Sequence, residues 1–412
     1  MNYPLKHAQQ VAFDGFSNFI SDPDAEVFVI EGYAGTGKST LVRHILDQLP
    51  KLIEAWRTLD PNYPDYEVSL TSTTHKAVEN LMQISGQDVK TIHSFLGLRL
   101  STDYKTGKSE LYPVKGFAIP NQHIVIIDEA SYLDSDLLSY VFTRTKNCKI
   151  IFIGDPAQLV DFRTNKAPVF DAGFPTVSLT EVVRNGGQIL ELSTACRNWV
   201  NTGVPIDFKP NGNDVVWLPH DEFNTAISDE FSRPDWKPSD SCFLAFQNTR
   251  INEYNAYINN VAKGDPDFQA GDVATVNSFF TERQARKTFK TGESVVIQNI
   301  EYAEELGLVG KYYHFGNIKA FKPDSLKEWR KAITKARAEE RFDEANKMQQ
   351  DWVDLRAIYA RTVHKSQGST FRRVFIDLGD LGKCKSMKQL PRLLYVAFSR
   401  PTDQIIMTGD IV

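Results

Sequence analysis

The segment EGYAGTGKST, residues 31–40, has the residue spacing most suggestive of chemistry. It fits the pattern G-x4-G-K-S, which is typical of a phosphate-binding loop (P-loop) between a strand and a helix. In such a loop backbone N–H groups turn toward phosphate oxygens, the lysine reaches the β- and γ-phosphates, and the serine hydroxyl can ligate Mg²⁺. We therefore expect nucleotide contacts from Gly32, Ala34, Gly35, Thr36, Gly37, Lys38, Ser39 and Thr40.

Two further segments could complete a nucleotide site. In HIVIIDEAS, Asp128 and Glu129 end an apolar run, and strand ends face the ligand-binding crevice of an open α/β sheet. Asp128 could hold Mg²⁺ through water, and Glu129 could orient and deprotonate the attacking water. In KIIFIGDPAQL, Gln158 could sense a γ-phosphate without titrating, although a Gly-Asp-Pro turn is the simpler interpretation of that segment alone.

Parallel strands would have to position these residues. Short apolar runs alternate with helical patterns, which predicts parallel sheets that helices cover on both faces. The runs are 27–30, 68–70, 124–127 and 150–153 in the first half, and 242–246, 358–359, 374–376 and 404–407 in the second. The sequence therefore predicts an α/β fold with two domains, 1–185 and 186–412.

The composition limits the classes of function. The 412 residues suffice for two or three domains. The formal charge of −5 gives no overall basic field, so any nucleic acid would have to bind in a local groove. The four cysteines lack zinc-site or redox spacing, which favours a reduced, intracellular setting. Because no secretory or membrane-spanning pattern is found, we expect a cytoplasmic protein.

Two segments interrupt the alternation of strands and helices. Residues 98–121 are polar and contain the turn signals DYKTG and PVKG, which predicts a hairpin-like insert in the first domain. Residues 270–350 begin with strand-like runs and continue as a charged helical region, where Ser325 and Glu328 have capping-box spacing. An apolar stripe there favours a helix packed on a neighbour over a helix dedicated to DNA.

The order of the motifs resembles the superfamily 1 helicases, and within them the RecD/Dda group, SF1B. The resemblance spans residues 9–400 and rests on the P-loop, TSTTHKAVENL, TIHSFLGL, DEAS, GDPAQL, LTEVVR, LAFQNTRINEYN, YARTVHKSQGST and LLYVAFSRP. It implies two RecA-like P-loop domains with ATP and Mg²⁺ in the cleft between them. It also implies a hairpin insert in the first domain and an SH3-like plus helical insert in the second.

The resemblance further implies roles at the nucleotide. Gln9 could pair with adenine, because its amide both donates and accepts. Arg184 and Arg400 resemble the family's two arginines on the γ-phosphate, a role that suits a planar, permanently charged group. Gly368 and Gln367 could touch the nucleotide or the domain junction. The expected catalytic set is Lys38, Asp128, Glu129, Gln158, Arg184 and Arg400, with Ser39 and Asp128 at the metal.

Four motifs would line a track for single-stranded DNA. Hydroxyls and amides can position phosphates, and aromatic rings can stack bases without reading sequence. Core packing is an equal alternative for the two phenylalanines, and a structural hydrogen bond is a serious alternative for the histidines. The candidates are Thr74, His75, Thr91, His93, Phe95, Phe246, Asn248, Thr362, His364, Lys365 and Ser366.

The function implied is a monomeric ATP-dependent DNA helicase that moves 5′→3′ in replication, recombination or repair, in bacterial or phage-infected cytoplasm. Its partners would be single-stranded DNA and junctions, with single-strand-binding or replication proteins as further candidates. The 98–121 insert would be the strand-separating pin, with Tyr104, Tyr112 and Phe117 as wedge candidates. Alternatives are an RNA track, a translocase that strips proteins from DNA, an inactive P-loop module and a small-molecule kinase.

Overall fold

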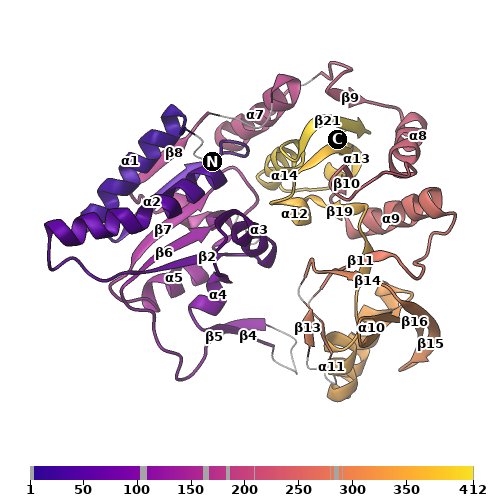
Figure 1. Ribbon diagram of the computed structural model, residues 1–412. Coiled ribbons are helices and arrows are strands. Elements are labelled where there is room, and N and C mark those ends of the chain that lie inside the picture. The colour runs from indigo at the N-terminus through magenta and orange to yellow at the C-terminus, as the bar shows by residue number, and fades with distance from the viewer. Residues whose placement is uncertain are drawn as a thin grey trace.

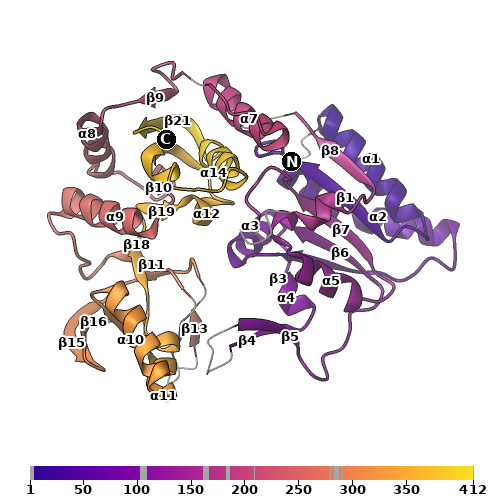
Figure 2. The same cartoon turned by 180° about the vertical axis from the view of Figure 1, so that it is seen from behind.

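The computed structural model describes residues 4–102, 109–160, 167–181, 186–207, 209–278, 280–282, 287–289 and 291–411. Two α/β domains lie side by side, and a smaller β-rich and helical unit extends from the second one (Figure 1). The view from behind shows the same arrangement, with the first-domain hairpin on the same side as this unit (Figure 2).

The first domain contains a six-stranded sheet in which every pair of neighbours is parallel, in the order β3-β2-β6-β7-β1-β8. Its strands are β1 (Val27–Gly32), β2 (Glu67–Ser72), β3 (Val89–Thr91), β6 (His123–Asp128), β7 (Lys149–Gly154) and β8 (Thr176–Leu179). The helices are α1 (His7–Ser21), α2 (Lys38–Leu59), α3 (His75–Ser85), α4 (Ile92–Phe95), α5 (Ser135–Thr143) and α6 (Pro168–Asp171), with the short 3-10 helix η1 (Ala130–Tyr132).

Burial on both faces explains why these strands read as continuous apolar runs. On β6, Ile124 and Ile126 pack in the cluster that contains α1, α2 and α3. Val125 and Ile127 point to the opposite face, where α4 and α5 cover the sheet. A strand buried on both faces needs apolar side chains at every position, because successive side chains alternate between the faces.

The second domain contains a five-stranded parallel sheet in the order β19-β10-β20-β21-β9. Its strands are β9 (Val215–Trp217), β10 (Ser241–Ala245), β19 (Ala360–Thr362), β20 (Phe371–Asp377) and β21 (Pro401–Thr408). Its helices are α7 (Gly187–Thr202), α8 (His220–Phe231), α9 (Asn248–Lys263), α12 (Val363–Ser366), α13 (Leu378–Leu381) and α14 (Gln389–Phe398). The predicted α/β fold with two parallel sheets is confirmed.

The predicted strand at 358–359 is wrong. These two residues lie between β18 (Leu355–Ala357) and β19. The first of these strands pairs with β11 of the insert, and the second pairs with β10 of the parallel sheet. The apolar pair at 358–359 is therefore the crossing point at which the chain leaves one sheet and joins another.

The first insert is a hairpin, and the second contains strands followed by helices, as the sequence predicted; its SH3-like form stays a prediction. The first is an antiparallel hairpin of β4 (Leu98–Thr102) and β5 (Ser109–Pro113); Tyr104 lies outside the described residues. The second combines β11 (Val273–Val276), β14 (Ser294–Val296) and β18 with a hairpin of β12 (Phe280–Glu282) and β13 (Lys287–Phe289). It continues through an unpredicted meander, β15 (Asn299–Glu305), β16 (Leu308–Phe315) and β17 (Ile318–Pro323), to helices α10 (Leu326–Ala338) and α11 (Phe342–Gln350).

The charged helix α10 packs on its neighbours as expected. The Ser325 hydroxyl accepts a hydrogen bond from the Glu328 N–H and caps the helix. Trp329 is buried with Trp352 and Phe321, so α10 lies against α11 and the meander. Within the described residues the four cysteines are free, and no helix has the length and apolar character needed to cross a membrane.

Lys149 joins the first sheet to α1. The residue opens β7, and only 2% of it is exposed. Its Nζ donates to the carbonyl oxygens of Phe19 (3.2 Å), Asp22 (2.6 Å) and Ala25 (2.8 Å). The last carbonyls of a helix lack partners within the helix, so this ammonium group serves as the cap of α1.

Replacing Lys149 should destabilise the domain. We expect Lys149→Ala to lower the free energy of unfolding by about 2–3 kcal/mol, because three carbonyl groups would lose a charged donor. Urea unfolding would measure the change. The exposed Lys146 provides the control, and Lys146→Ala should change stability by less than about 0.5 kcal/mol. Equal effects of the two substitutions would contradict the capping role of Lys149.

Candidate functional site

The P-loop lies between β1, which ends at Gly32, and α2, which begins at Lys38. Gly35 and Gly37 both have a φ of +81°, and a Cβ added to Gly37 would lie 2.4 Å from Gln9 Nε2. Ser39 and Thr40 are exposed in the first turn of the helix. A helix start preceded by a glycine loop suits an anion, because unpaired N–H groups and the helix dipole both favour negative charge there.

The side chains of the loop hold it together in this structure. Lys38 Nζ donates to the carbonyl oxygens of Gly32 and Tyr33, at 3.1 Å for Tyr33. The Thr36 hydroxyl also donates to the Tyr33 oxygen, at 2.8 Å. Lys38 is therefore bonded to carbonyl groups that a phosphate would have to replace as its partners.

Gln9 lies against the P-loop. Its Nε2 donates to the Gly37 oxygen at 3.1 Å, and its Oε1 accepts from the Lys6 N–H at 3.0 Å. Both ends of the amide are thus bonded to the chain itself. Pairing with adenine stays a prediction, and it would require Gln9 to exchange these two partners.

Asp128 ends β6 and Glu129 follows it, at the same edge of the sheet as the P-loop. Burial raises the pKa of both carboxyl groups, and the neighbouring Asp128 charge raises that of Glu129 further, while Lys38 opposes both shifts. Glu129 has a left-handed backbone, φ +55°, which is unusual outside glycine and recurs at functional sites. Its Oε2 is buried and accepts no hydrogen bond from any described residue, as a base that awaits water would require.

The residues at this edge fit a magnesium ion. The Ser39 hydroxyl and the Asp128 carboxylate are the oxygen ligands that Mg²⁺ prefers. Ser39 follows β1 and Asp128 ends β6, and both strands belong to one parallel sheet, so both residues stand at its carboxyl end. The Lys38 charge acts on Asp128 and lowers its pKa against the effect of burial.

Gln158 and Arg400 lie at the interface between the domains. Gln158 is buried, and its Oε1 accepts from Gln367 Nε2, while Gln367 Oε1 accepts from the Tyr132 hydroxyl. Arg400, only 3% exposed, donates to the carbonyl oxygens of Val396 (3.0 Å) and Ser369 (3.2 Å). Its charge opposes the burial that raises the Glu129 pKa, so Arg400 acts on the candidate base across the interface. Arg184 lies outside the described residues.

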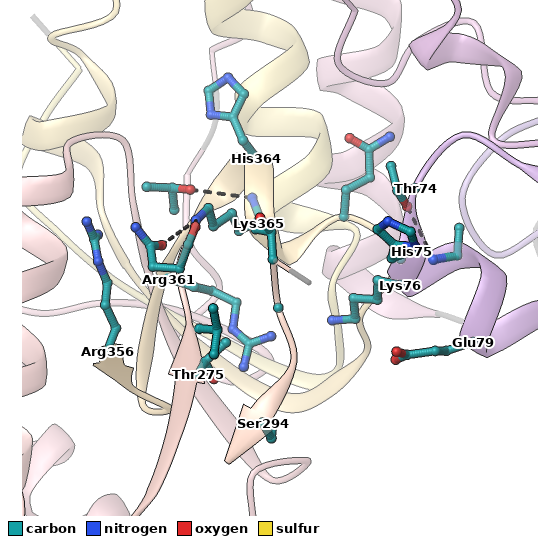
Figure 3. Close-up of a pocket in the computed structure, with 18 of the residues that line it drawn as sticks. Thr74, His75, Lys76, Glu79, Thr275, Ser294, Arg356, Arg361, His364 and Lys365 are labelled. Atoms are coloured by element: carbon teal, nitrogen blue, oxygen red, sulfur yellow. Dashed lines mark hydrogen bonds between the residues drawn. The ribbon is translucent and has the colours of Figure 1, made fainter. Parts of the chain in front are cut away.

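A cavity of about 740 Å³ lies between the domains and is lined from both sides (Figure 3). The predicted contacts that line it are Thr74, His75, Thr91, His93, Asn248, Thr362, His364 and Lys365. Gly368 lines it too, and its carbonyl accepts from Asn80 Nδ2 at 3.1 Å, which places Gly368 at the domain junction.

Three predicted residues lie away from the described cavity wall. Phe95 is buried in the first core, with its ring 5.6 Å from that of His123. Phe246 packs against the second core, with its ring 6.1 Å from that of His364. Ser366 is fully buried and donates to the Val363 oxygen at 2.8 Å. For the phenylalanines, the structure therefore shows the core-packing alternative, and the Ser366 hydroxyl is used within its own turn.

Three of the threonines that line the cavity, those predicted as DNA contacts, cap helices. Thr74 accepts from the Ala77 N–H (3.2 Å), Thr91 from the Ser94 N–H (3.2 Å) and Thr362 from the Lys365 N–H (3.4 Å). Each oxygen is used as an acceptor, and each hydroxyl keeps a proton that it can donate. Strand ends in both domains thus present hydroxyl donors beside N–H groups to the cavity.

Sequence reasoning missed several cations of the cavity. Lys76, Arg356 and Arg361 line it together with Lys365, and Glu79 and Glu129 are the acidic groups in the described lining. Figure 3 shows Lys76 on the first-domain wall and the other three cations on the second. Lys76 and Arg361 stand within the motifs quoted above, next to the predicted contacts His75 and Thr362, whereas Arg356 has no sequence signal. It is held by Asp354 and donates to Asn248 Oδ1 at 2.7 Å.

Burial lowers the pKa of two of these lysines. Burial and, second in size, the Arg361 charge lower the pKa of Lys76 to about 8. Burial and, second in size, the Arg356 charge lower the pKa of Lys365 to about 8. Burying these positive charges costs free energy. Buried cations in a cavity that both domains line are expected where a polyanion binds.

Comparisons with known proteins agree with this geometry. Residues 5–201 match a family model described as an AAA domain, and residues 357–408 match the UvrD-like helicase C-terminal domain. The chain is 27% identical to the ATP-dependent DNA helicase dda of Enterobacteria phage T4 over 452 residues, which covers 96% of this chain and 97% of that protein.

Two solved structures share the fold at 16% identity. A Pif1 helicase from Bacteroides in complex with ADP-AlF3 and ssDNA gives a TM-score of 0.50 and covers all of this chain and 94% of its own. A structure of two coordinating Pif1 helicases on forked dsDNA gives a TM-score of 0.51 and covers all of this chain and 93% of its own.

These likenesses confirm the predicted fold class of two RecA-like domains and the resemblance to the superfamily 1B helicases. Within that group, the chain is similar over nearly its whole length to the phage T4 Dda helicase.

The shifted lysines can be tested directly. We expect the reactivity of Lys76 and Lys365 toward an acylating reagent to rise with a midpoint near pH 8, because their pKa values are lowered to about 8. Mass spectrometry of the modified peptides across a pH series would measure it. Arg361→Gln should raise the midpoint of Lys76, because the Arg361 charge lowers its pKa. The midpoint of Lys365 should stay unchanged, because the Arg356 charge acts on that lysine instead. Midpoints near the ordinary lysine value of about 10.4 would contradict the shifts.

Proposed function

We propose that this chain is an ATP-dependent DNA helicase, which moves 5′→3′ on single-stranded DNA and couples Mg-ATP hydrolysis to unwinding. One observation carries the proposal. Glu129, Tyr132 and Gln367 line the cavity and also belong to the candidate nucleotide site. Single-stranded DNA bound in the cavity would therefore contact residues that also surround the γ-phosphate of ATP.

The chemistry would follow from the residues at the edge of the first sheet. Lys38 would leave the carbonyls of Gly32 and Tyr33 and turn to the β- and γ-phosphates. Glu129 Oε2 would take the proton of the attacking water, since it is buried and has no protein partner. Mg²⁺, when bound by Ser39 and Asp128, would supply charge neutralisation between the phosphates.

The second domain would complete the site. Arg400 would bring a permanent positive charge toward the γ-phosphate, and Arg184 would add a second. In this structure Arg400 is bonded to carbonyls of its own domain, so it would have to exchange those partners when the cleft closes. Hydrolysis would thereby be linked to movement of one domain against the other, with Gln9 and Gly368 at the two ends of the nucleotide.

The cavity would hold the track. Its cations and capping hydroxyls suit phosphates, which gives affinity without sequence preference. The hairpin β4–β5 would act as the pin; Tyr112 on β5 is 43% exposed, and Phe117, which follows the hairpin, is 40% exposed. Direction, the DNA rather than RNA track and a cytoplasmic role in replication, recombination or repair are drawn from the likeness to the Dda helicase.

The first experiment is ATP hydrolysis with and without single-stranded DNA. We expect at least about tenfold stimulation by DNA, since the two sites share residues. Lys38→Ala should reduce the stimulated rate below about 1% of the wild-type rate, because the phosphates lose their charged donor. Lys327→Ala, on the exposed face of α10, is the matched control and should keep the full rate. Steady hydrolysis that ignores DNA would refute the helicase proposal.

Direction needs a second assay. We expect the protein to unwind a duplex with a 5′ single-stranded tail and to leave a duplex with only a 3′ tail intact. Gel separation of the product strand would measure both. Preference for the 3′ tail would reverse the proposed direction. DNA-stimulated hydrolysis without unwinding of either substrate would favour a translocase that strips proteins from DNA.

A further inference from the structure

Two side chains of the second domain hold one short segment of the P-loop, Tyr33 and Ala34. The Tyr395 hydroxyl of α14 accepts from the Ala34 N–H at 2.8 Å. The same hydroxyl donates to Asp155 Oδ2, beyond the end of β7, at 2.7 Å. From α7, the Arg197 guanidinium carbon lies 4.0 Å from the centroid of the Tyr33 ring, within the range of a cation–π contact.

The helices that carry Tyr395 and Arg197 pack against each other. They lie side by side at the face of the second domain that meets the first (Figure 1). Their apolar faces pack in the core of the second domain, through residues such as Cys196 and Leu394. Ala157 and Leu159 from the first domain are buried in that same core, and Tyr33 and Ala34 pack against it. The second core thus continues up to the P-loop.

Helix α14 also contacts the first domain through Arg392, one turn before Tyr395. Arg392 donates to the carbonyl oxygens of Pro156 (2.6 Å) and Gln158 (2.7 Å). The helix is therefore bonded to the loops that follow β1 and β7, and both loops belong to the candidate nucleotide site. Movement of α14 must act on the two loops together.

The Tyr33 carbonyl is the point at which the nucleotide would act on the same segment. It accepts from Lys38 Nζ (3.1 Å), the Thr36 hydroxyl (2.8 Å) and the Thr36 N–H (3.2 Å). When Lys38 turns to a phosphate, this carbonyl loses its charged partner. The peptide group between Tyr33 and Ala34 would then keep its bonds to Thr36 on one side and to Tyr395 on the other.

The electrostatics support a coupling role. Arg197 forms no ion pair or hydrogen bond with any residue that the structure describes, so its charge is not neutralised there by a neighbour. Burial and the Asp155 charge raise the pKa of Tyr395 well above its usual value, which keeps its proton on the hydroxyl for donation to Asp155. The lone pair of that hydroxyl is then free to accept from Ala34.

We infer that Tyr395 and Arg197 are positioning residues through which the second domain, where half of the nucleic-acid cavity lies, sets the conformation of the P-loop. The inference rests on the proposed function and adds to it a route from DNA to ATP that is separate from Arg184 and Arg400. A strand that shifts the second domain would move α7 and α14, and these would move Tyr33 and Ala34.

The test compares ATP hydrolysis with and without oligo-dT in matched variants. Tyr395→Phe removes one hydroxyl and keeps the buried ring. We expect the ratio of the two rates to fall by about tenfold, the factor of one hydrogen bond to a charged group. Arg197→Gln should lower the ratio by about threefold, as a partly exposed cation–π pair is weaker. Arg197→Lys should restore part of this loss, since it keeps the charge.

Two controls separate coupling from general damage. Tyr254→Phe removes another buried hydroxyl, bonded to Asn224 Oδ1 at 3.0 Å far from the P-loop, and should keep the wild-type ratio. In the double variant of Tyr395→Phe and Arg197→Gln, the loss should be smaller than the product of the single losses, because both residues act on one segment.

The outcomes distinguish this inference from the proposed function. A wild-type ratio in both Tyr395→Phe and Arg197→Gln would overturn the inference and leave the helicase proposal standing. Equal loss of both rates, with the ratio unchanged, would also overturn it, since that is a merely structural effect on the loop. If Tyr395→Phe fails to fold in a thermal unfolding assay, the ratio of Arg197→Gln decides. Absence of stimulation in the wild type would overturn the proposed function and the inference with it.

Discussion

The parallel alignment of strands is the constraint on which both candidate sites depend. Parallel neighbours place all their carboxyl ends at one edge of a sheet. In the first domain this edge collects the P-loop after β1, Asp128 at the end of β6 with Glu129 next to it, and Asp155 to Gln158 after β7. In the second it collects Thr362, the last residue of β19. The carboxyl edges of the two sheets face the same cavity, so the fold itself brings the polar groups of both domains together.

A buried polar interface adds order to this arrangement. The bonds from Gln367 to Gln158 and from Tyr395 to Asp155 join buried side chains across the domains, and the Tyr395 hydroxyl also accepts from the partly buried Ala34 N–H. Buried donors and acceptors are costly to leave unpaired, so such a network specifies one relative placement of the domains. A change that opens the cleft must break several of these bonds at once, which favours a switch between two arrangements over gradual movement.

Sequence alone could predict the strands that are apolar on both faces and the residues that follow them, because burial and strand-end position leave strong patterns. It failed where a residue's role depends on a partner far along the chain. The pair at 358–359 looked like a strand, yet it joins two sheets. The meander alternates polar and apolar residues over short spans, and no local signal distinguished it. Lys76, Arg356 and Tyr395 became visible only through partners such as Ser369, Asn248 and Ala34.

The lowered pKa values of Lys76 and Lys365 have a consequence for the energetics with which the cavity would bind a nucleic-acid strand. Near pH 8 each lysine is neutral for part of the time, and a phosphate beside it would restore the charge. Engagement of a strand would therefore take up protons from the solvent, and release would return them. Because Lys76 stands on the first domain and Lys365 on the second, a strand passed between the domains would be accompanied by a proton exchanged with the buffer. The measured heat of binding would then depend on the ionisation enthalpy of the buffer.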